Sequence, residues 1–98
     1  MGIRIAFQNM NHQPVEMVSG FDQSKLHELI EAATAGSLLD GIQRQSDTMY
    51  NSYQLEFLLA ELSAIRAEGT GEQEVVSVLR RAAETAIRRH GYLWFSAD

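Results

Sequence analysis

Four polar side chains recur between residues 47 and 61, and they are the first candidates for a functional site. Asp47, Gln54 and Glu61 are spaced seven residues apart, so on a helix they form a line along the edge of the apolar stripe. Asn51 projects into the stripe near its N-terminal end. Polar groups in such positions need hydrogen-bond partners. Either Asp47 or Thr48 caps the helix and the amides bond to the preceding loop or the C-terminal strand, or the four form a polar ligand site.

Aromatic residues in the same stretch provide a second candidate, a surface for a protein partner. Tyr50, Tyr53 and Phe57 fall on the helix face opposite the leucines of the apolar stripe. A helix with apolar residues on two faces is either packed on both sides within its own fold or covered by a partner. Tyrosine supplies a large contact area at interfaces and keeps a polar group. The predicted partner contacts are Tyr50, Tyr53, Glu56, Phe57 and Glu61.

Other residue types that commonly carry chemistry are missing or isolated. The chain has no cysteine, which excludes disulfides, thiol catalysis and metal sites built on cysteine. His12, His27 and His90 stand far apart and belong to no metal-binding motif. The phosphate-binding patterns GxGxxG and GxxxxGK[ST] and the nucleophile patterns GxSxG and SxxK do not occur. We therefore predict no catalytic residue, no metal, no cofactor and no enzymatic activity.

Size and charge narrow the class of protein further. Ninety-eight residues with 45% hydrophobic side chains make a single folded domain, 1–98. The net charge of −5 would repel a phosphate backbone, so a nucleic-acid partner is disfavoured. No apolar run is long enough for a signal peptide or a membrane span, so we expect a cytoplasmic protein without membrane contact. Four arginines near the C-terminus, Arg80, Arg81, Arg88 and Arg89, are interpreted as complements to a helix dipole.

The chain begins with the pattern of a β-hairpin. Ile3, Ile5 and Phe7 alternate with Arg4, Ala6 and Gln8, which predicts a half-buried strand over residues 3–8. A polar connection leads to residues 15–18, which can return as a second strand. Because Pro14 cannot donate to a neighbouring strand, it belongs at the first position of this strand or on an edge.

Three helices follow in the predicted order of elements. The first opens at Asp22 or Ser24 and ends at Gly36, with Leu26, Leu29, Ile30 and Ala33 on its apolar face. The central helix runs from about Asp47 or Thr48 to Ala67 and stops at Gly69, with Leu55, Leu58, Leu59, Leu62 and Ile65 on one stripe. The third starts at a capping box, Thr70 to Gln73, and continues to Gly91.

The C-terminal segment Tyr92-Leu93-Trp94-Phe95 is apolar on both faces of a strand. It is therefore either central in a small sheet or covered by a partner. Together these elements predict an α+β fold, in which a short β-sheet made of the N-terminal hairpin and the C-terminal strand is covered by about three helices.

Residues 37–98 also resemble a group of small uncharacterised bacterial proteins. The resemblance is carried by Leu38-Leu39-x-x-Ile42, Asp47-Thr48-Met49-Tyr50-Asn51-x-x-Gln54, Leu58-x-x-Glu61-Leu62 and Tyr92-Leu93-Trp94-Phe95-x-x-Asp98. Members of the group carry a DTxFNxxQ-like segment and end in YLWFxGD. Here Tyr50 stands in the aromatic slot, Ala97 replaces a glycine, and residues 43–46 replace a more turn-like stretch. The resemblance implies a recurring fold and a bacterial source, and it implies no reaction.

These observations favour a non-enzymatic protein-binding module. In its specific form, the hypothesis is an immunity or antitoxin-type protein that neutralises a bacterial toxin acting in the cytoplasm, because the chain is small, acidic and rich in aromatics suited to an interface. The alternative is a small-ligand-binding or regulatory domain that uses Asp47, Asn51, Gln54 and Glu61. A homodimer closed through the tyrosine face is compatible with either function.

Overall fold

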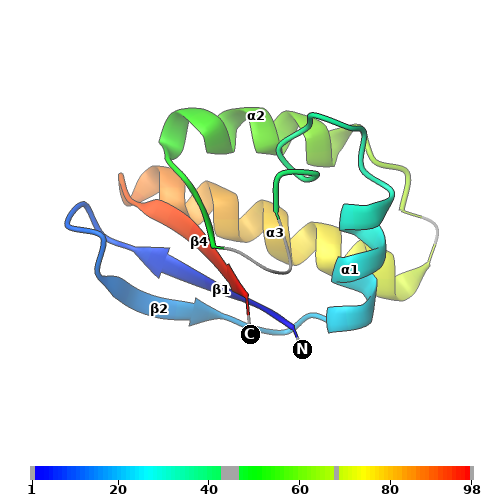
Figure 1. Ribbon diagram of the computed structural model, residues 1–98, viewed down its shortest axis with the longest axis horizontal. Coiled ribbons are helices and arrows are strands. Elements are labelled where there is room, and N and C mark those ends of the chain that lie inside the picture. The colour runs from blue at the N-terminus through cyan, green and yellow to red at the C-terminus, as the bar shows by residue number, and fades with distance from the viewer. Residues whose placement is uncertain (1, 43–46, 68, 98) are drawn as a thin grey trace.

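Four antiparallel strands form one sheet in the order β2-β1-β4-β3, in a computed structural model that describes residues 2–42, 47–67 and 69–97 (Figure 1). The strands are β1 (Ile3–Gln8), β2 (Pro14–Val18), β3 (Thr48–Tyr50) and β4 (Tyr92–Ala97). The predicted hairpin is confirmed as the pair β1 and β2, and Pro14 opens the edge strand β2. The sheet and three helices confirm the predicted α+β class.

The helices are α1 (Gln23–Glu31), α2 (Ser52–Ser63) and α3 (Thr70–Arg88), and all three lie on one face of the sheet (Figure 1). The core fills the space between these layers. Its fully buried side chains include Ile5 from β1, Leu26 from α1, Leu58 from α2, Leu79 from α3 and Phe95 from β4. None of the helices in the described part of the chain is long and apolar enough to cross a membrane.

The apolar C-terminal segment forms a central strand of the sheet, which is one of the two positions predicted for it. β4 pairs with β1 on one side and with β3 on the other. Leu93 and Phe95 point into the core and are fully buried, whereas Trp94 belongs to the opposite face. Leu93 and Phe95 are thus part of the core beneath the helices, whereas Trp94, on the face without helices, is only partly buried.

A row of apolar residues crosses the sheet on the face away from the helices. Pairing places Met17, Ala6, Trp94 and Met49 side by side, one from each strand. The His12 ring covers the end of this row, because it stacks on Tyr92 with ring centroids 4.3 Å apart and its Nδ1 lies 3.3 Å from the Met49 sulfur. Met17 and Met49 remain exposed. This outer face is therefore an exposed apolar surface, separate from the one on α2 described below.

The predicted start of the central helix was wrong. Thr48–Tyr50 forms the edge strand β3, which was not predicted, and α2 begins only at Ser52. The reason is tertiary: Thr48, Met49 and Tyr50 pair with β4 and complete the sheet. The helix also ends earlier than Ala67, at Ser63. The leucines predicted to face inward do so, since Leu55, Leu58 and Leu62 are buried.

The ends of the other two helices follow the predictions in part. Asp22 caps α1 and accepts a 2.8 Å hydrogen bond from the Ser24 amide, but the helix ends at Glu31 and not near Gly36. The predicted capping box of α3 was wrong, because the N-cap is Gly69 and it makes no side-chain bond. Gln73 instead donates to the Ala67 carbonyl over 3.5 Å.

The C-terminus of α3 closes in a Schellman turn. His90 adopts the left-handed conformation at φ 55°, and its amide donates to the Ile87 carbonyl while the Gly91 amide donates to the Ala86 carbonyl. The helix thus ends at Arg88, slightly before the predicted end at Gly91, and the left-handed residue is His90. Gly91 has a different role: a Cβ at this position would lie 2.2 Å from the Gln8 carbonyl oxygen of β1.

Candidate functional site

The predicted polar line on the central helix is divided by the structure. Asn51 is the N-cap of α2, and it forms a reciprocal capping box with Gln54. The Gln54 amide donates to Asn51 Oδ1 over 2.9 Å, and the Asn51 amide donates to Gln54 Oε1 over 3.0 Å. Asp47 precedes β3 and is not part of the helix. Asn51 and Gln54 thus cap the N-terminus of α2, whereas Glu61 lies in the second half of this helix and apart from them.

Glu61 fixes the segment that links α1 to β3. Its carboxylate accepts hydrogen bonds from two successive backbone amides, Leu38 N to Oε2 at 2.9 Å and Leu39 N to Oε1 at 3.1 Å. Bonds between amides and a carboxylate are about twice as strong as those between neutral groups. The two bonds connect α2 with a segment more than twenty residues away in sequence. Leu39 of this segment is buried in the core. The sequence predicted Glu61 as a site residue but not these partners.

Tyr50 belongs to the core and not to an exposed helix face, so its predicted position was wrong. Its side chain is 5% exposed, and its ring packs edge-on against Phe95 with centroids 5.9 Å apart. The hydroxyl donates to the Leu38 carbonyl. Gly41 allows this approach, because a Cβ there would lie 2.7 Å from the hydroxyl oxygen. Burial first, and then the negative charges of Glu61 and Asp40, raise the pKa of Tyr50 to about 12.

Tyr50→Phe should change how stability depends on alkaline pH. The pKa of an unfolded tyrosine is about 10, so the folded state holds the Tyr50 proton more strongly. The resulting stabilisation is complete below about pH 10 and is lost as the pH rises towards about 12. At neutral pH the phenylalanine variant should lose about 1 kcal/mol, the value of one hydrogen bond. Urea unfolding of both proteins at about pH 8 and about pH 11 measures the difference, which should shrink at the higher pH. A difference that stays constant would contradict this account.

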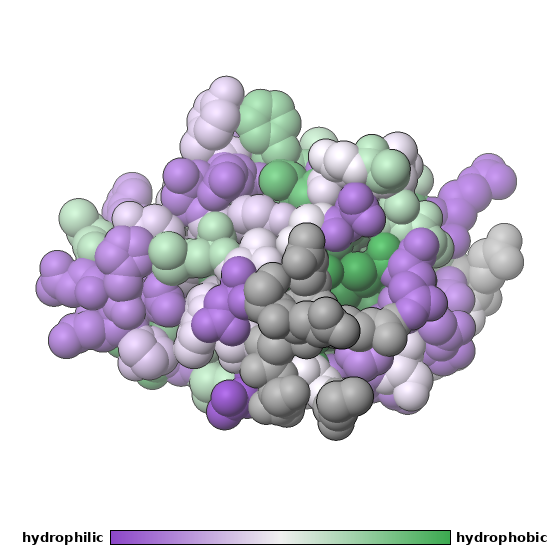
Figure 2. Space-filling view, viewed as in Figure 1, coloured by the Kyte–Doolittle hydropathy of each residue, from purple (hydrophilic) through white to green (hydrophobic). Residues whose placement is uncertain are grey.

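Tyr53 and Phe57 are exposed on the outer surface of α2, as predicted. Their side chains are 72% and 53% exposed, and the rings touch edge to face with centroids 5.1 Å apart. Ala60 and Ala64 are also exposed and follow at helical spacing, so the four residues form a continuous line that we call the α2 stripe. Hydrophobic side chains stand out from the surface over α2, at the top of Figure 2. Glu56, beside the stripe, is exposed as well.

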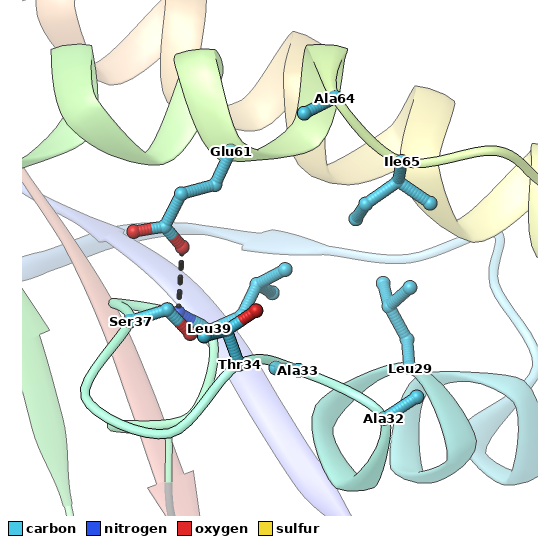
Figure 3. Close-up of a pocket in the computed structure, with 9 residues that line it drawn as sticks. All are labelled: Leu29, Ala32, Ala33, Thr34, Ser37, Leu39, Glu61, Ala64 and Ile65. Carbon is cyan, nitrogen blue, oxygen red and sulfur yellow. Dashed lines mark hydrogen bonds between the residues drawn. The ribbon is translucent and has the colours of Figure 1, made fainter.

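A cavity of about 360 Å³ opens at the C-terminal end of the α2 stripe. Figure 3 shows its walls: Leu29 of α1 and Ala32, which follows this helix, face Ala64 and Ile65 at the end of α2, and the Glu61 carboxylate closes one side. The walls are mainly apolar, with the carboxylate as the charged group among them. Sequence analysis did not predict this cavity, because it is formed where three segments meet that are distant in the chain.

The described residues offer no arrangement typical of a metal centre. Within residues 2–42, 47–67 and 69–97, no three histidine, aspartate or glutamate side chains are grouped closely enough to hold an ion. What the geometry brings together is an exposed aromatic pair, an acidic helix surface and a cavity closed by a carboxylate.

The resemblance to small bacterial proteins remains a prediction. The structure shows how two of its segments are used, since Asn51 and Gln54 cap α2 and Leu93 and Phe95 fill the core. Residues 43–46, which lie between two of the segments, and Asp98, which ends the last one, lie outside the described residues. Compared with protein-family models, with curated proteins and with solved structures, the chain matches none, so its function has to be inferred from its own geometry.

Proposed function

We propose that this chain is a non-enzymatic protein-binding module that contacts its partner through the α2 stripe. The observation that carries the proposal is the exposed pair Tyr53 and Phe57 on the outer surface of α2. Exposed aromatic side chains lose contact with water when a partner covers them, and aromatic residues contribute a large part of the binding energy at interfaces. The two rings already support each other, so less side-chain freedom remains to be lost on binding.

Charge gives the proposed surface a preferred kind of partner. The chain carries a net charge of −5, and Glu56 lies on α2 between the two aromatic residues. A negative surface attracts a basic protein over several ångströms and raises the rate of association. Tyr50, which was also predicted as a contact, is buried and would take part only indirectly, by holding β3 in place.

In its specific form, the proposal is an immunity or antitoxin-type protein that neutralises a bacterial toxin in the cytoplasm. Small size, acidic charge and an exposed aromatic surface suit a protein that covers the working surface of a basic or nucleotide-handling target. The resemblance to small bacterial proteins is consistent with such a source. Co-expression with the partner tests this form directly: the wild-type chain should restore the growth of a host that the partner alone arrests.

A pull-down from the native bacterium with matched variants tests the surface. The variant Tyr53→Ala/Phe57→Ala removes the aromatic pair, and Met17→Ala/Met49→Ala removes two exposed apolar side chains from the outer face of the sheet. We expect one stoichiometric partner with the wild type and with the methionine variant, and a loss of at least about tenfold in affinity with the aromatic variant. Circular dichroism checks that both variants are folded. Equal binding by the wild type and the aromatic variant would reject this surface.

The second candidate function is a small-ligand-binding or regulatory domain, and the cavity beside Glu61 is the observation that favours it. Asn51 and Gln54 are engaged in the capping box, so Glu61 is the member of the predicted polar site that lines the cavity. Thermal shift against a metabolite panel separates this function from protein binding. A ligand at about a hundred times its Kd should add ~2.7 kcal/mol to stability. Light scattering on the purified chain tests the predicted homodimer.

A further inference from the structure

The cavity beside Glu61 joins an apolar wall to a fixed negative charge. Leu29 and Ile65 face each other across its opening, and the Glu61 carboxylate lies on one side (Figure 3). The amides of Leu38 and Leu39 hold the carboxylate, one on each oxygen, so its position is set before anything binds. Each carboxylate oxygen can accept more than one hydrogen bond, so Glu61 retains acceptor capacity for a further donor.

The surroundings of the cavity favour a positive charge. Neither the ion pair between Lys25 and Glu28 nor the one between Arg89 and Glu16 involves Glu61. Asp40 lies near enough to act with Glu61 on the Tyr50 hydroxyl. A second hollow, of about 520 Å³, shares Leu29, Ala32 and Ile65 with the cavity. Glu28, Glu31 and Glu72 line this hollow together with Arg66, and Lys25 is paired with Glu28.

An aliphatic cation matches both parts of the cavity. Lysine and arginine side chains pack their methylene stems along apolar surface and place a charged group at the end. Such a stem would lie between Leu29 and Ile65, with the cationic group against Glu61. A guanidinium offers several donors to a carboxylate, which favours arginine. A volume of about 360 Å³ is at the lower end of the range for small-ligand sites, so one long side chain fits better than a bulky molecule.

The cavity is continuous with the surface proposed for the partner. Ala64 is the last residue of the α2 stripe and also lines the cavity. A segment that packs along Tyr53 and Phe57 would therefore reach the opening after about two helical turns. Acidic groups near the opening complement a basic segment. The same cation from a free metabolite would have no reason to contact the stripe.

We propose that the Glu61 cavity accepts a basic side chain, preferably an arginine, from the partner segment that packs on the α2 stripe. This inference rests on the proposed protein-binding function and adds the chemistry of the partner. The partner should carry an arginine or lysine next to apolar residues that cover Tyr53 and Phe57.

NMR titration of the ¹⁵N-labelled full chain tests the cavity without the partner. The probe is Nα-acetyl-arginine amide, and the matched control is Nα-acetyl-citrulline amide, which has nearly the same shape and no charge. We expect saturable, millimolar binding of the arginine probe, with shifts at the amides of Leu38, Leu39 and Ile65, and at least about tenfold weaker binding of the control. Equal responses to both probes, or no shifts around the cavity, would overturn the proposal. Glu61→Gln should reduce binding of the arginine probe to the level of the citrulline probe. If that variant is unfolded, the comparison of the two probes on the wild type tests the proposal by itself.

A second probe distinguishes a partner segment from a free cation. A blocked helical peptide with two leucines, one and two turns away from a single arginine, should bind at least about tenfold more tightly than the blocked arginine and should also shift Tyr53 and Phe57. A peptide that binds no better would overturn the assignment to a partner segment and indicate a free cation. If the probes bind as expected but Tyr53→Ala/Phe57→Ala still retains the cellular partner, the proposed surface fails and the cavity stands. If the aromatic variant loses the cellular partner but the probes do not bind around Glu61, the proposal for the cavity fails and the proposed surface stands.

Discussion

Gly91→Ala should destabilise the protein by roughly 3 kcal/mol and lower its Tm by more than about 10 °C. The methyl group would have to occupy space already filled by the backbone of β1, because a Cβ on Gly91 lies 2.2 Å from the Gln8 carbonyl oxygen. Backbone in the middle of a sheet cannot move aside as a flexible side chain can. Either β1 shifts, or the turn between α3 and β4 opens, and both changes disturb the central pair of strands.

Gly69→Ala is the matched control for this prediction. It introduces the same methyl group at the N-cap of α3, where a Cβ meets nothing within 4 Å. We expect a loss of about 0.5 kcal/mol or less, because alanine is a poorer N-cap than glycine. Thermal and urea unfolding of both variants measure the difference. If Gly91→Ala is as stable as Gly69→Ala, then the close approach to β1 does not restrict this position.

Most of the elements were predictable from residue spacing. The alternation of Ile3, Ile5 and Phe7 identified β1, and the leucine periodicity identified the buried face of α2. These signals are strong because each element buries one regular face. The central position of β4 was one of the two positions that its residues predicted, because large apolar side chains on both faces of a strand indicate either a central strand or cover by a partner.

The strand β3 could not be recognised in the same way. Three residues are too few to show an alternating pattern, and Thr48–Tyr50 directly precedes a strongly periodic helix. The capping box at Asn51 and Gln54 marks the true start of α2, but the same two residues also fitted a polar line inside a longer helix. Pairing with β4, more than forty residues away, decides between these structures. That contact is tertiary and leaves no local signal.

The position of the helix start determined which aromatics could face a partner. Once α2 begins at Ser52, Tyr53 and Phe57 remain on its exposed surface, whereas Tyr50 moves into the core. The role of Glu61 was likewise beyond local patterns, because its partners Leu38 and Leu39 are 23 and 22 residues away in sequence. The residue types of the site were therefore predictable, and their spatial grouping was not.

Glu61→Ala should destabilise the protein by about 2–3 kcal/mol. The substitution leaves the amides of Leu38 and Leu39 without their acceptor, and an unpaired, partly buried amide costs about 1–3 kcal/mol. Water entering the neighbouring cavity can solvate these amides to some extent, which keeps the total below the sum for two fully buried groups. Glu56→Ala removes a carboxylate from the exposed surface of the same helix and should stay within about 0.5 kcal/mol of the wild type.

The loss of stability in Glu61→Ala should be concentrated in the described residues between α1 and β3. This segment is held from two sides, by Glu61 of α2 and by β3, whose Tyr50 donates to the Leu38 carbonyl and whose Thr48 hydroxyl donates to the Gly41 carbonyl over 3.2 Å. Removal of Glu61 releases the Leu38 and Leu39 amides and keeps the bonds to Tyr50 and Thr48. Hydrogen exchange at Leu38 and Leu39 should therefore accelerate by more than about tenfold.

Glu61→Gln separates the loss of hydrogen bonds from the loss of charge. The carboxamide keeps one oxygen, which can still accept from one of the two amides, and we expect a destabilisation of about 1–1.5 kcal/mol with intermediate exchange rates. If Glu61→Ala were as stable as Glu56→Ala, or if exchange rose equally over the whole domain, Glu61 would not fix this segment. The cavity beside it would then lack the preset carboxylate on which recognition of a basic side chain depends.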